Sequence, residues 1–586
     1  RPGFTIETAQ SNLAAIAREL ERQYPDSNRD QGAHVQPLHR LISGDLRPLL
    51  LMLLAGALLL LVISCVNVVS LLLVRTEKRR REIAIRGALG ASPGRLAAQF
   101  ATEGVLLMAA GAALGLALAA MLIPTLLKLV PRAILLYVPF LDGLRLDARA
   151  MAFALVVSLI AGLAFTLAPI AHVALAKTVA ALAEGSRGSG GLAWRRLGSR
   201  LVVVEFACAM VLLTGAGLVG QSLYRLLDVE LGFNPAPLAM LSVAPPKQRY
   251  AAPAQRLQLA ERLRERLLQL PGVTGVAAAS SPPVGENGNT NWVRIVGKPW
   301  NGERIETLYR PVTAGYFETL GARLVRGRFF TAQDDAAHPK VMVINETMAR
   351  RYFPGEDPVG QRVGDLKLNP RSLVEIVGVV ADIRDGGLDQ EVWPATYLPF
   401  AQEPDDFYAL VVRSAGDPVG LLSLMSRAVK EVDRGVAVLD EQTFLERIQR
   451  STPAYVHRSA AWLTGGFAAL ALVLSIVGLY GVVAYSVSQR TREIGVRMAL
   501  GADGALVRRL ILRESGSLLA LAAGLGLLGG WGATRALRGM FFGLDRPAPW
   551  MPLLALAVLG IAALLATHLP ARRAAGVNPV EALRAE

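Results

Sequence analysis

The sequence predicts a polytopic α-helical membrane protein with seven spans and a soluble α+β domain inserted between spans four and five. Its 586 residues are 52% hydrophobic and only 19% charged, and the mean hydropathy is +0.38. Several apolar runs reach the roughly 20 helical residues that cross a bilayer. Basic clusters adjoin these runs at alternate ends, and Lys and Arg favour cytoplasmic loops.

The chain also repeats itself. Residues 81–91 recur at 492–502, an offset of 411, with eight identical positions. The tails 169–182 and 570–583 match at an offset of 401. Such self-similarity predicts a tandem duplication. The first unit lacks a leading span and most of an outer domain, so we expect a longer parent chain with eight spans and two outer domains.

The predicted organisation follows from these patterns. Residues 1–47 form the end of a first outer domain, 48–184 hold three spans and a charged inner loop at 75–95, and 185–200 form a basic inner linker. Residues 201–224 are the fourth span, 225–458 the outer insert, and 459–586 three spans and an inner tail. The predicted spans are Leu49–Val74, Leu96–Leu129, Ala150–Ala176, Leu201–Leu223, Ala460–Val487, Val507–Leu537 and Met551–Leu569.

The soluble parts show both helical and alternating patterns. In the first segment, Ala9–Tyr24 reads as an amphipathic helix, and a short strand is expected around His34–Leu38. The insert is large enough for its own core, and we expect two α+β lobes. Its helices are predicted at Ala254–Leu270 and Leu421–Val432, and its strands at Trp292–Val296, Val341–Ile344, Glu375–Val380 and Leu410–Val412.

Composition argues against several other classes of function. The net charge is +15, but the basic residues cluster beside apolar runs, which favours membrane topology over nucleic-acid binding. The two cysteines, Cys65 and Cys208, lie inside apolar runs, and the six histidines are scattered, so no metal spacing is present. The run Gly215–Ser222 resembles a phosphate loop but lacks its lysine.

The second copy of the repeat argues against Ser92 as a catalytic nucleophile. Residues 90–94 fit G-x-S-x-G, but Asp503 stands where the first copy has Ser92. Serine and aspartate share a strong preference for helix N-caps, and Pro93 suits the first helical position. We therefore predict that Ser92 and Asp503 are helix caps and that the chain carries no catalytic set.

Small residues recur on the helices that follow the charged loops. Glycine and alanine four positions apart allow membrane helices to approach closely. Because both copies share the register, we expect a packing seam, placed between the two halves. Its residues are Gly111, Gly115 and Ala119 in the first copy and Ala522, Gly526 and Gly530 in the second.

These motifs resemble a known family. The repeated loop and the tail at 570–584, Pro-Ala-Arg-Arg-Ala-x-x-x-Asn-Pro-Val-Glu-Ala-Leu-Arg, look like the FtsX-like permease domain. The insert resembles the MacB-type periplasmic core domain at 316–321, 327–330, 343–346, 352–354, 358–360 and 377–382. The duplicated layout is similar to the acidobacterial duplicated orphan permeases.

The resemblance implies a permease subunit of a type VII ABC transport system in a bacterial inner membrane. A separate cytoplasmic ATPase dimer would carry ATP and Mg, with no cofactor in this chain, and would move the periplasmic domains by mechanotransmission. The two halves would form a pseudo-dimer, exporting or extracting peptides, drugs or lipoproteins, with or without a periplasmic adaptor. The alternative is a signalling protein that activates a periplasmic partner such as a cell-wall hydrolase.

The resemblance also assigns residues. Glu82 with Arg86, and Glu493 with Arg497, lie one helical turn apart, and a short charged helix of this kind can seat in a groove on an ATPase. The expected ATPase-coupling residues are Arg81, Glu82, Ile83, Arg86, Leu89, Gly90 and Ala91, and Arg492, Glu493, Ile494, Arg497, Leu500, Gly501 and Ala502. The cytoplasmic tail contributes Arg572, Arg573, Pro579 and Leu583.

Overall fold

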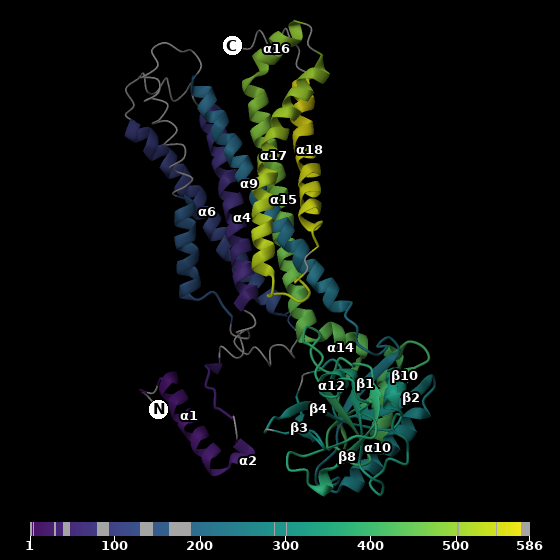
Figure 1. The fold of residues 1–586 in the computed structure, drawn as a ribbon. Helices are drawn as coiled ribbons and strands as arrows, with labels where there is room; N and C mark the ends of the chain where they lie inside the picture. The colour runs from purple at the N-terminus through teal and green to yellow at the C-terminus, as the bar shows by residue number, and fades with distance from the viewer. Residues whose placement is uncertain are drawn as a thin grey trace. The chain divides into compact units, whose positions relative to one another are not determined.

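The computed structural model describes residues 3, 5–28, 31–38, 47–78, 93–128, 130, 144–162, 189–285, 288–300, 302–500, 503–545 and 548–575. The chain divides into two compact units, and each is described by itself. One unit comprises Arg1–Val35 and Tyr224–Val456, and the other comprises Gln36–Leu223 and His457–Glu586. The first contains the soluble segments and the second contains the long apolar helices (Figure 1).

Six helices in the described part of the chain are long and apolar enough to cross a bilayer. They are α4 (Arg47–Lys78), α6 (Pro93–Lys128), α9 (Ser189–Leu227), α15 (Thr452–Gln489), α17 (Gly504–Leu537) and α18 (Met551–Ala575). The predicted third span is described only as the shorter apolar helix Ala148–Gly162; the rest of it lies outside the described residues. A short helix, α16 (Thr491–Ala499), separates α15 from α17.

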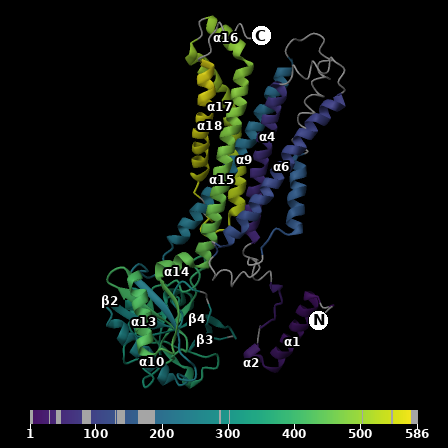
Figure 2. The same cartoon turned by 180° about the vertical axis from the view of Figure 1, so that it is seen from behind.

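The membrane unit is helical because lipid offers no hydrogen bonds to a free backbone. Its helices pack through a cluster that includes Ile63 of α4, Met210 of α9, Ala471 of α15, Ala522 of α17 and Leu559 of α18, all buried. In both views α4, α9 and α15 run side by side (Figures 1 and 2). This packing joins a helix of the first repeat to helices of the second.

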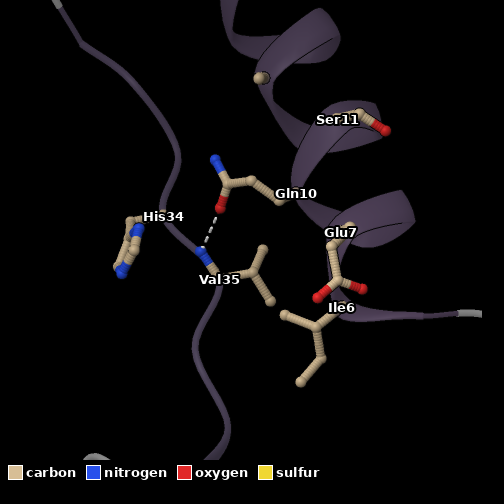
Figure 3. A pocket seen from close by; sticks show the side chains of 7 residues that line it. Ile6, Glu7, Gln10, Ser11, His34 and Val35 are labelled. Atoms are coloured by element: carbon tan, nitrogen blue, oxygen red, sulfur yellow. Dashed lines mark hydrogen bonds between the residues drawn. The ribbon is translucent and has the colours of Figure 1, made fainter.

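The N-terminal segment contains α1 (Ile6–Gln23) and α2 (Pro25–Asn28). Thr5 caps α1, since its hydroxyl accepts from the backbone N–H of Thr8 at 3.3 Å. The strand predicted around His34–Leu38 is wrong: residues 31–37 are irregular. The Gln10 side chain satisfies their backbone instead, donating to Ala33 O and accepting from Val35 N, both at 2.6 Å. Figure 3 shows the hydrogen bond between Val35 and Gln10 beside the recess that Gln10 lines with Ile6, Glu7 and His34.

The soluble insert begins with a four-stranded antiparallel layer. The strand order is β11 (Ala437–Thr443), β1 (Leu238–Ala244), β10 (Tyr408–Ser414), β2 (Val273–Ala279). Alternate strand residues face α10 (Pro253–Leu268) and α13 (Leu422–Val432). Leu241, Leu263 and Met425 are fully buried in the core between them. The amphipathic patterns that predict both helices are therefore confirmed.

The second layer of strands closes on itself. Its order is β4 (Ile305–Val312), β3 (Thr290–Ile295), β7 (Arg362–Gly364), β8 (Val374–Val380), β6 (Val341–Asn345), β9 (Ala395–Pro399), and β9 pairs back with β4 in parallel. The edge strand β5 (Leu324–Gly327) pairs with β8. Closure leaves few unpaired edges, which guards against aggregation. Ile295, Ile344 and Ile376 of these strands are buried together in one cluster.

One sheet links the two predicted lobes, because β2 pairs with β4 at Ala279 and Val312. Three short helices cover the remaining faces: α11 (Tyr316–Leu320), α12 (Glu346–Tyr352) and α14 (Phe444–Arg450). Two 3₁₀ turns, Pro370–Ser372 and Pro418–Leu421, complete the elements. Phe317 of α11 and Phe444 of α14 are almost fully buried in a second core. The insert is thus α+β, as predicted.

The side chain of Asn345 on β6 makes hydrogen bonds to α12 and to the segment around the start of β9. Its side-chain oxygen accepts from Met348 N at 3.0 Å, capping α12, and from Ala395 N at 2.9 Å, while its amide donates to Trp393 O at 2.8 Å. Asn345→Ala leaves these buried groups unpaired and is expected to cost about 2–4 kcal/mol. Pulse proteolysis of the insert in urea measures the loss. The exposed Asn234, which accepts one local turn bond, is the matched control, and equal losses for both variants would contradict the prediction.

Asp334 makes the stability of the insert depend on pH. Burial alone would raise the pKa of its carboxyl, but hydrogen bonds from Arg328 (2.8 Å to each oxygen) and from Thr331 together hold that pKa below its usual range. The stabilisation is complete above the unfolded-state pKa of about 3.9 and is lost as pH falls through the lower folded-state pKa. Wild-type protein should therefore lose more urea resistance between about pH 5 and pH 2 than Asp334→Asn does. Parallel pH curves would refute this.

Candidate functional site

The second copy of the charged loop forms a short helix between two membrane helices. After α15 ends at Gln489, α16 occupies Thr491–Ala499, and α17 begins at Gly504. The Ile494 N–H donates to Arg490 O at 2.8 Å and the Leu500 N–H to Val496 O at 3.0 Å. The loop is therefore a short helix that lies at the end of the bundle and follows α15 and precedes α17 in the chain (Figure 1).

An apolar contact holds α16 in place. Ile494 is 6% exposed and packs with Val507 of α17 and Ala574 of α18, with Met498 and Ile511 at the edge of the cluster. Burying an isoleucine contributes about 1.5–3 kcal/mol. This explains why an isoleucine stands at this position among charged neighbours.

Two ion pairs surround that contact. Arg497 donates to Glu493 at 2.6 Å, with both side chains about half exposed. Arg490 donates to both carboxylate oxygens of Glu514 on α17, at 3.0 and 3.1 Å. The first pair is an exposed i,i+4 pair worth about 0.3–0.5 kcal/mol, whereas the second ties the start of α16 to α17. The expected spacing of Glu493 and Arg497 on one face is thus observed.

The outer side of the unit is apolar as well as charged. Leu500 is 83% exposed, and Leu506 and Val496 are 61% and 41% exposed. A large exposed aliphatic side chain beside a charged helix is the composition of a protein-binding anchor with a polar rim. The arrangement therefore suits contact with another protein rather than chemistry.

Asp503 occupies the N-cap position but not with the predicted bond. Its backbone is extended and its carbonyl accepts from Leu506 N at 2.9 Å, yet its carboxylate makes no capping hydrogen bond. A negative charge at a helix N-terminus is still favourable. In the first copy α6 begins at Pro93 as expected, while Ser92 lies outside the described residues.

Several expected site residues also fall outside the described part of the chain. They are Arg81, Glu82, Ile83, Arg86, Leu89, Gly90, Ala91, Gly501, Ala502, Pro579 and Leu583, and the side chain of Arg492. Of the two tail arginines, Arg572 is exposed and Arg573 donates to the hydroxyl of Tyr480 at 3.2 Å. The tail arginine thus joins α18 to α15.

The ladder of small residues differs between the copies. Ala522, Gly526 and Gly530 are buried on α17, and a Cβ at Gly526 would lie 2.6 Å from the sulfur of Met210 on α9. The seam predicted between the two halves therefore lies within the second one, because α9 is the span that leads this unit. Gly111 and Gly115 of α6 are exposed, and a Cβ added at either would meet no atom of another segment within 4 Å, while Ala119 is half-buried.

A buried polar pair inside the bundle was missed by the sequence reasoning. Asn67 of α4 donates to Glu205 of α9 at 2.7 Å and to Leu474 O of α15 at 3.1 Å. Glu205 is 1% exposed and Asn67 6%. The signal was available, because a carboxylate inside an otherwise apolar span marks a site with a partner.

The insert holds a second buried charged group. Asp385 accepts from the Tyr397 hydroxyl at 2.6 Å and lies 3.9 Å from Arg310, and both charged side chains are 1% exposed. Burial raises the pKa of the Asp385 carboxyl, while Arg310 and Tyr397 oppose the rise. Arg310 also donates to the Gly288, Asn289 and Tyr309 carbonyls. We interpret this cluster as structural, because the Arg310 guanidinium donates its hydrogen bonds to backbone carbonyl groups. Among the described residues, no three His, Cys, Asp or Glu side chains gather as metal ligands would.

Comparison with known families agrees with this layout. Residues 207–433 match the MacB-like periplasmic core domain, and residues 54–176 and 465–579 each match the FtsX-like permease C-terminal domain. The two FtsX-like segments coincide with the two repeats found in the sequence. The matched segments are permease and periplasmic core segments, and none is an ATPase domain.

Individual proteins are similar over about half of the chain. "Macrolide export ATP-binding/permease protein MacB" of Marinobacter nauticus is 29% identical over 45% of this chain and 41% of its own length. "Uncharacterized ABC transporter permease YknZ" of Bacillus subtilis is 26% identical over 49% of this chain and 72% of its own length. The chain thus covers less than half of the macrolide exporter. The solved periplasmic region of MacB from Actinobacillus actinomycetemcomitans aligns with 38% of this chain and 96% of its own, at 14% identity and a TM-score of 0.26.

The contact between α17 and α9 can be tested with two glycines of one helix. Gly526→Leu forces a side chain into Met210, whereas a side chain at the exposed Gly524 meets no atom within 4 Å. Overpacking of this kind costs about 1–3 kcal/mol. We expect Gly526→Leu to lower the thermal unfolding midpoint of the full chain in detergent and Gly524→Leu to leave it near the wild-type value. Equal midpoints would contradict the packing described here.

Proposed function

Because this chain is an FtsX-like permease with a MacB-like periplasmic core domain, we propose that it is the permease subunit of an ABC transport system. In this proposal a separate cytoplasmic ATPase dimer binds ATP and Mg and drives movement of the periplasmic domains. The observation that carries it is α16, a charged helix followed by the exposed Leu500 and packed in one cluster with Val487 of α15, Val507 of α17 and Ala574 of α18. A helix that is packed against the membrane helices in this way would move with them when a bound protein moves.

The contacts of α16 support coupling in both directions along the chain. Ile494 binds it to α17 and α18, and Arg490 binds its first turn to Glu514 of α17. On its other side α15 continues without a break from Gln489 back to Thr452, and only Ser451 separates α15 from α14 of the insert. In this proposal α15, which is continuous from Thr452 to Gln489, is the segment through which a displacement of α16 is transmitted along the chain.

We further propose an orientation and a substrate class. Basic residues at 75–81, 195–200, 490–497 and 572–573 place those ends in the cytoplasm by the positive-inside rule, so the N-terminal segment and the insert are periplasmic and the C-terminus is cytoplasmic. The proposed substrates are peptides, drugs or lipoproteins taken up from the periplasmic side, and the macrolide exporters among the relatives support the drug class. The two FtsX-like halves then act as a pseudo-dimer.

The exposed leucine gives a direct test. We expect Leu500→Asp to weaken binding of the ABC ATPase that co-purifies with the full chain by about tenfold or more, and to remove stimulation of its ATPase activity in lipid, because a hot-spot anchor is replaced by a charge. Leu439→Asp on β11, 46% exposed in the wild type, is the matched control and should bind as wild type. Binding affinity and ATPase rate are both measured.

Two outcomes would overturn the proposal. One is that no ABC ATPase co-purifies with the chain. The other is that Leu500→Asp, Glu493→Arg and Arg497→Glu all leave binding and stimulation intact. If ATPase coupling holds but no candidate peptide, drug or lipoprotein changes the rate, the transport part fails, and activation of a periplasmic hydrolase is the function to assay next.

A further inference from the structure

Residues at equivalent positions of the two repeats meet each other in the membrane unit. The offset of 411 pairs Gly56 with Phe467 and Asn67 with Gly478. A Cβ atom added at Gly56 would lie 2.9 Å from the Phe467 ring, and one added at Gly478 would lie 2.2 Å from the side-chain oxygen of Asn67. In a two-fold arrangement, only residues beside the axis contact their own equivalents. The pseudo-two-fold axis therefore runs between α4 and α15.

The contacting positions form one stripe on each helix. The spacings i, i+4, i+7 and i+11 place them on a single helical face. The stripe of α4 is Gly56, Leu60, Ile63 and Asn67, and that of α15 is Phe467, Ala471, Leu474 and Gly478. All four central residues belong to the same hydrophobic cluster. At both outer contacts a glycine on one helix accommodates a large side chain on the other.

At the polar end of the stripe, only one of the two equivalent positions carries a polar side chain. Asn67 of the first repeat donates to Glu205 and to Leu474 O, whereas its equivalent in the second repeat is Gly478. A side chain at position 478 would come within 2.4 Å of one Glu205 oxygen and 2.7 Å of the other. Glycine at 478 thus makes room for the amide and the carboxyl group, and separating them would leave a buried polar group without its hydrogen-bond partner.

From these contacts we propose that α4 and α15 form a heterotypic seam, in which each copy of the duplicated helix fits the other and rejects a copy of itself. Two α15 helices meeting along this stripe would place Phe467 against Phe467 and leave Glu205 without its amide donor. Two α4 helices would set Gly56 against Gly56 and leave a void. The partner of each stripe is therefore the other half of the same chain, and this face does not support a homodimer. The inference holds whichever task the permease performs.

Exchange of the two residues at the first contact tests the fit. Gly56→Phe crowds Phe467, and Phe467→Gly leaves a cavity, so each should lower the thermal midpoint of the full chain in detergent by roughly 4–10 °C. The double variant Gly56→Phe/Phe467→Gly restores one large and one small residue and should recover more than half of the summed loss. Gly466→Phe, at an exposed neighbour with no atom within 4 Å, controls for adding a phenylalanine to α15. Strictly additive losses in the double variant would overturn the proposal.

Disulfide trapping identifies the partner. In a chain with Cys65→Ser and Cys208→Ser, cysteines are introduced as Gly56→Cys, Phe467→Cys or both, and a protease site is inserted at the exposed Gly416 turn. Under oxidation in lipid, the pair should hold the two cleavage fragments together, and neither lone cysteine should give a covalent dimer. A dimer through a lone cysteine at 56 or 467 would show that like faces meet. Failure of the pair to link would show that the two stripes do not meet, and either result refutes the seam.

Discussion

The hydrogen bond between Asn67 and Glu205 is the polar constraint around which three helices of the membrane unit are arranged. A carboxyl group that is 1% exposed is costly in an apolar interior unless a hydrogen-bond partner meets it. The donor comes from the first repeat and the acceptor from the leading helix of the second, and the Leu474 carbonyl of α15 takes the other amide hydrogen. Three helices are therefore held at one point. Apolar side chains alone would not specify that point, because lipid tails compete with them for contact.

Close approach of helices also explains three glycines of the bundle. Gly56, Gly478 and Gly526 each face an atom that a Cβ would overlap, so each marks a place where two helices approach closely. Other glycines of the bundle, such as Gly466 and Gly524, face open space. The small residues of this bundle therefore divide into those that packing demands and those that the apolar composition of a span merely tolerates.

Much of the architecture was predictable because its causes are local. Apolar length predicts spans, and alternation predicts strands such as β6 and β8, since both depend on neighbouring residues. The failures were nonlocal. The strand expected around His34–Leu38 is replaced by backbone held by the distant Gln10. The small-residue ladder was assigned to the wrong neighbour, because a sequence shows that a helix face is small and not which helix covers it. Asp503 is the N-cap of α17 as predicted, but its side chain makes no capping hydrogen bond, and the sequence alone does not distinguish these two cases.

The apolar contact of α16 contributes more free energy than its exposed ion pair. Burial of Ile494 contributes about 1.5–3 kcal/mol, several times the roughly 0.3–0.5 kcal/mol of an exposed ion pair such as Glu493–Arg497. The apolar contact with Val507 and Ala574 therefore keeps the helix seated, and the ion pair can exchange partners at little cost. The proposed coupling to an ATPase, which binds and releases during each cycle, would need this combination in α16. Its charges are free to re-pair, its leucine is exposed, and its attachment to the membrane helices does not rely on either.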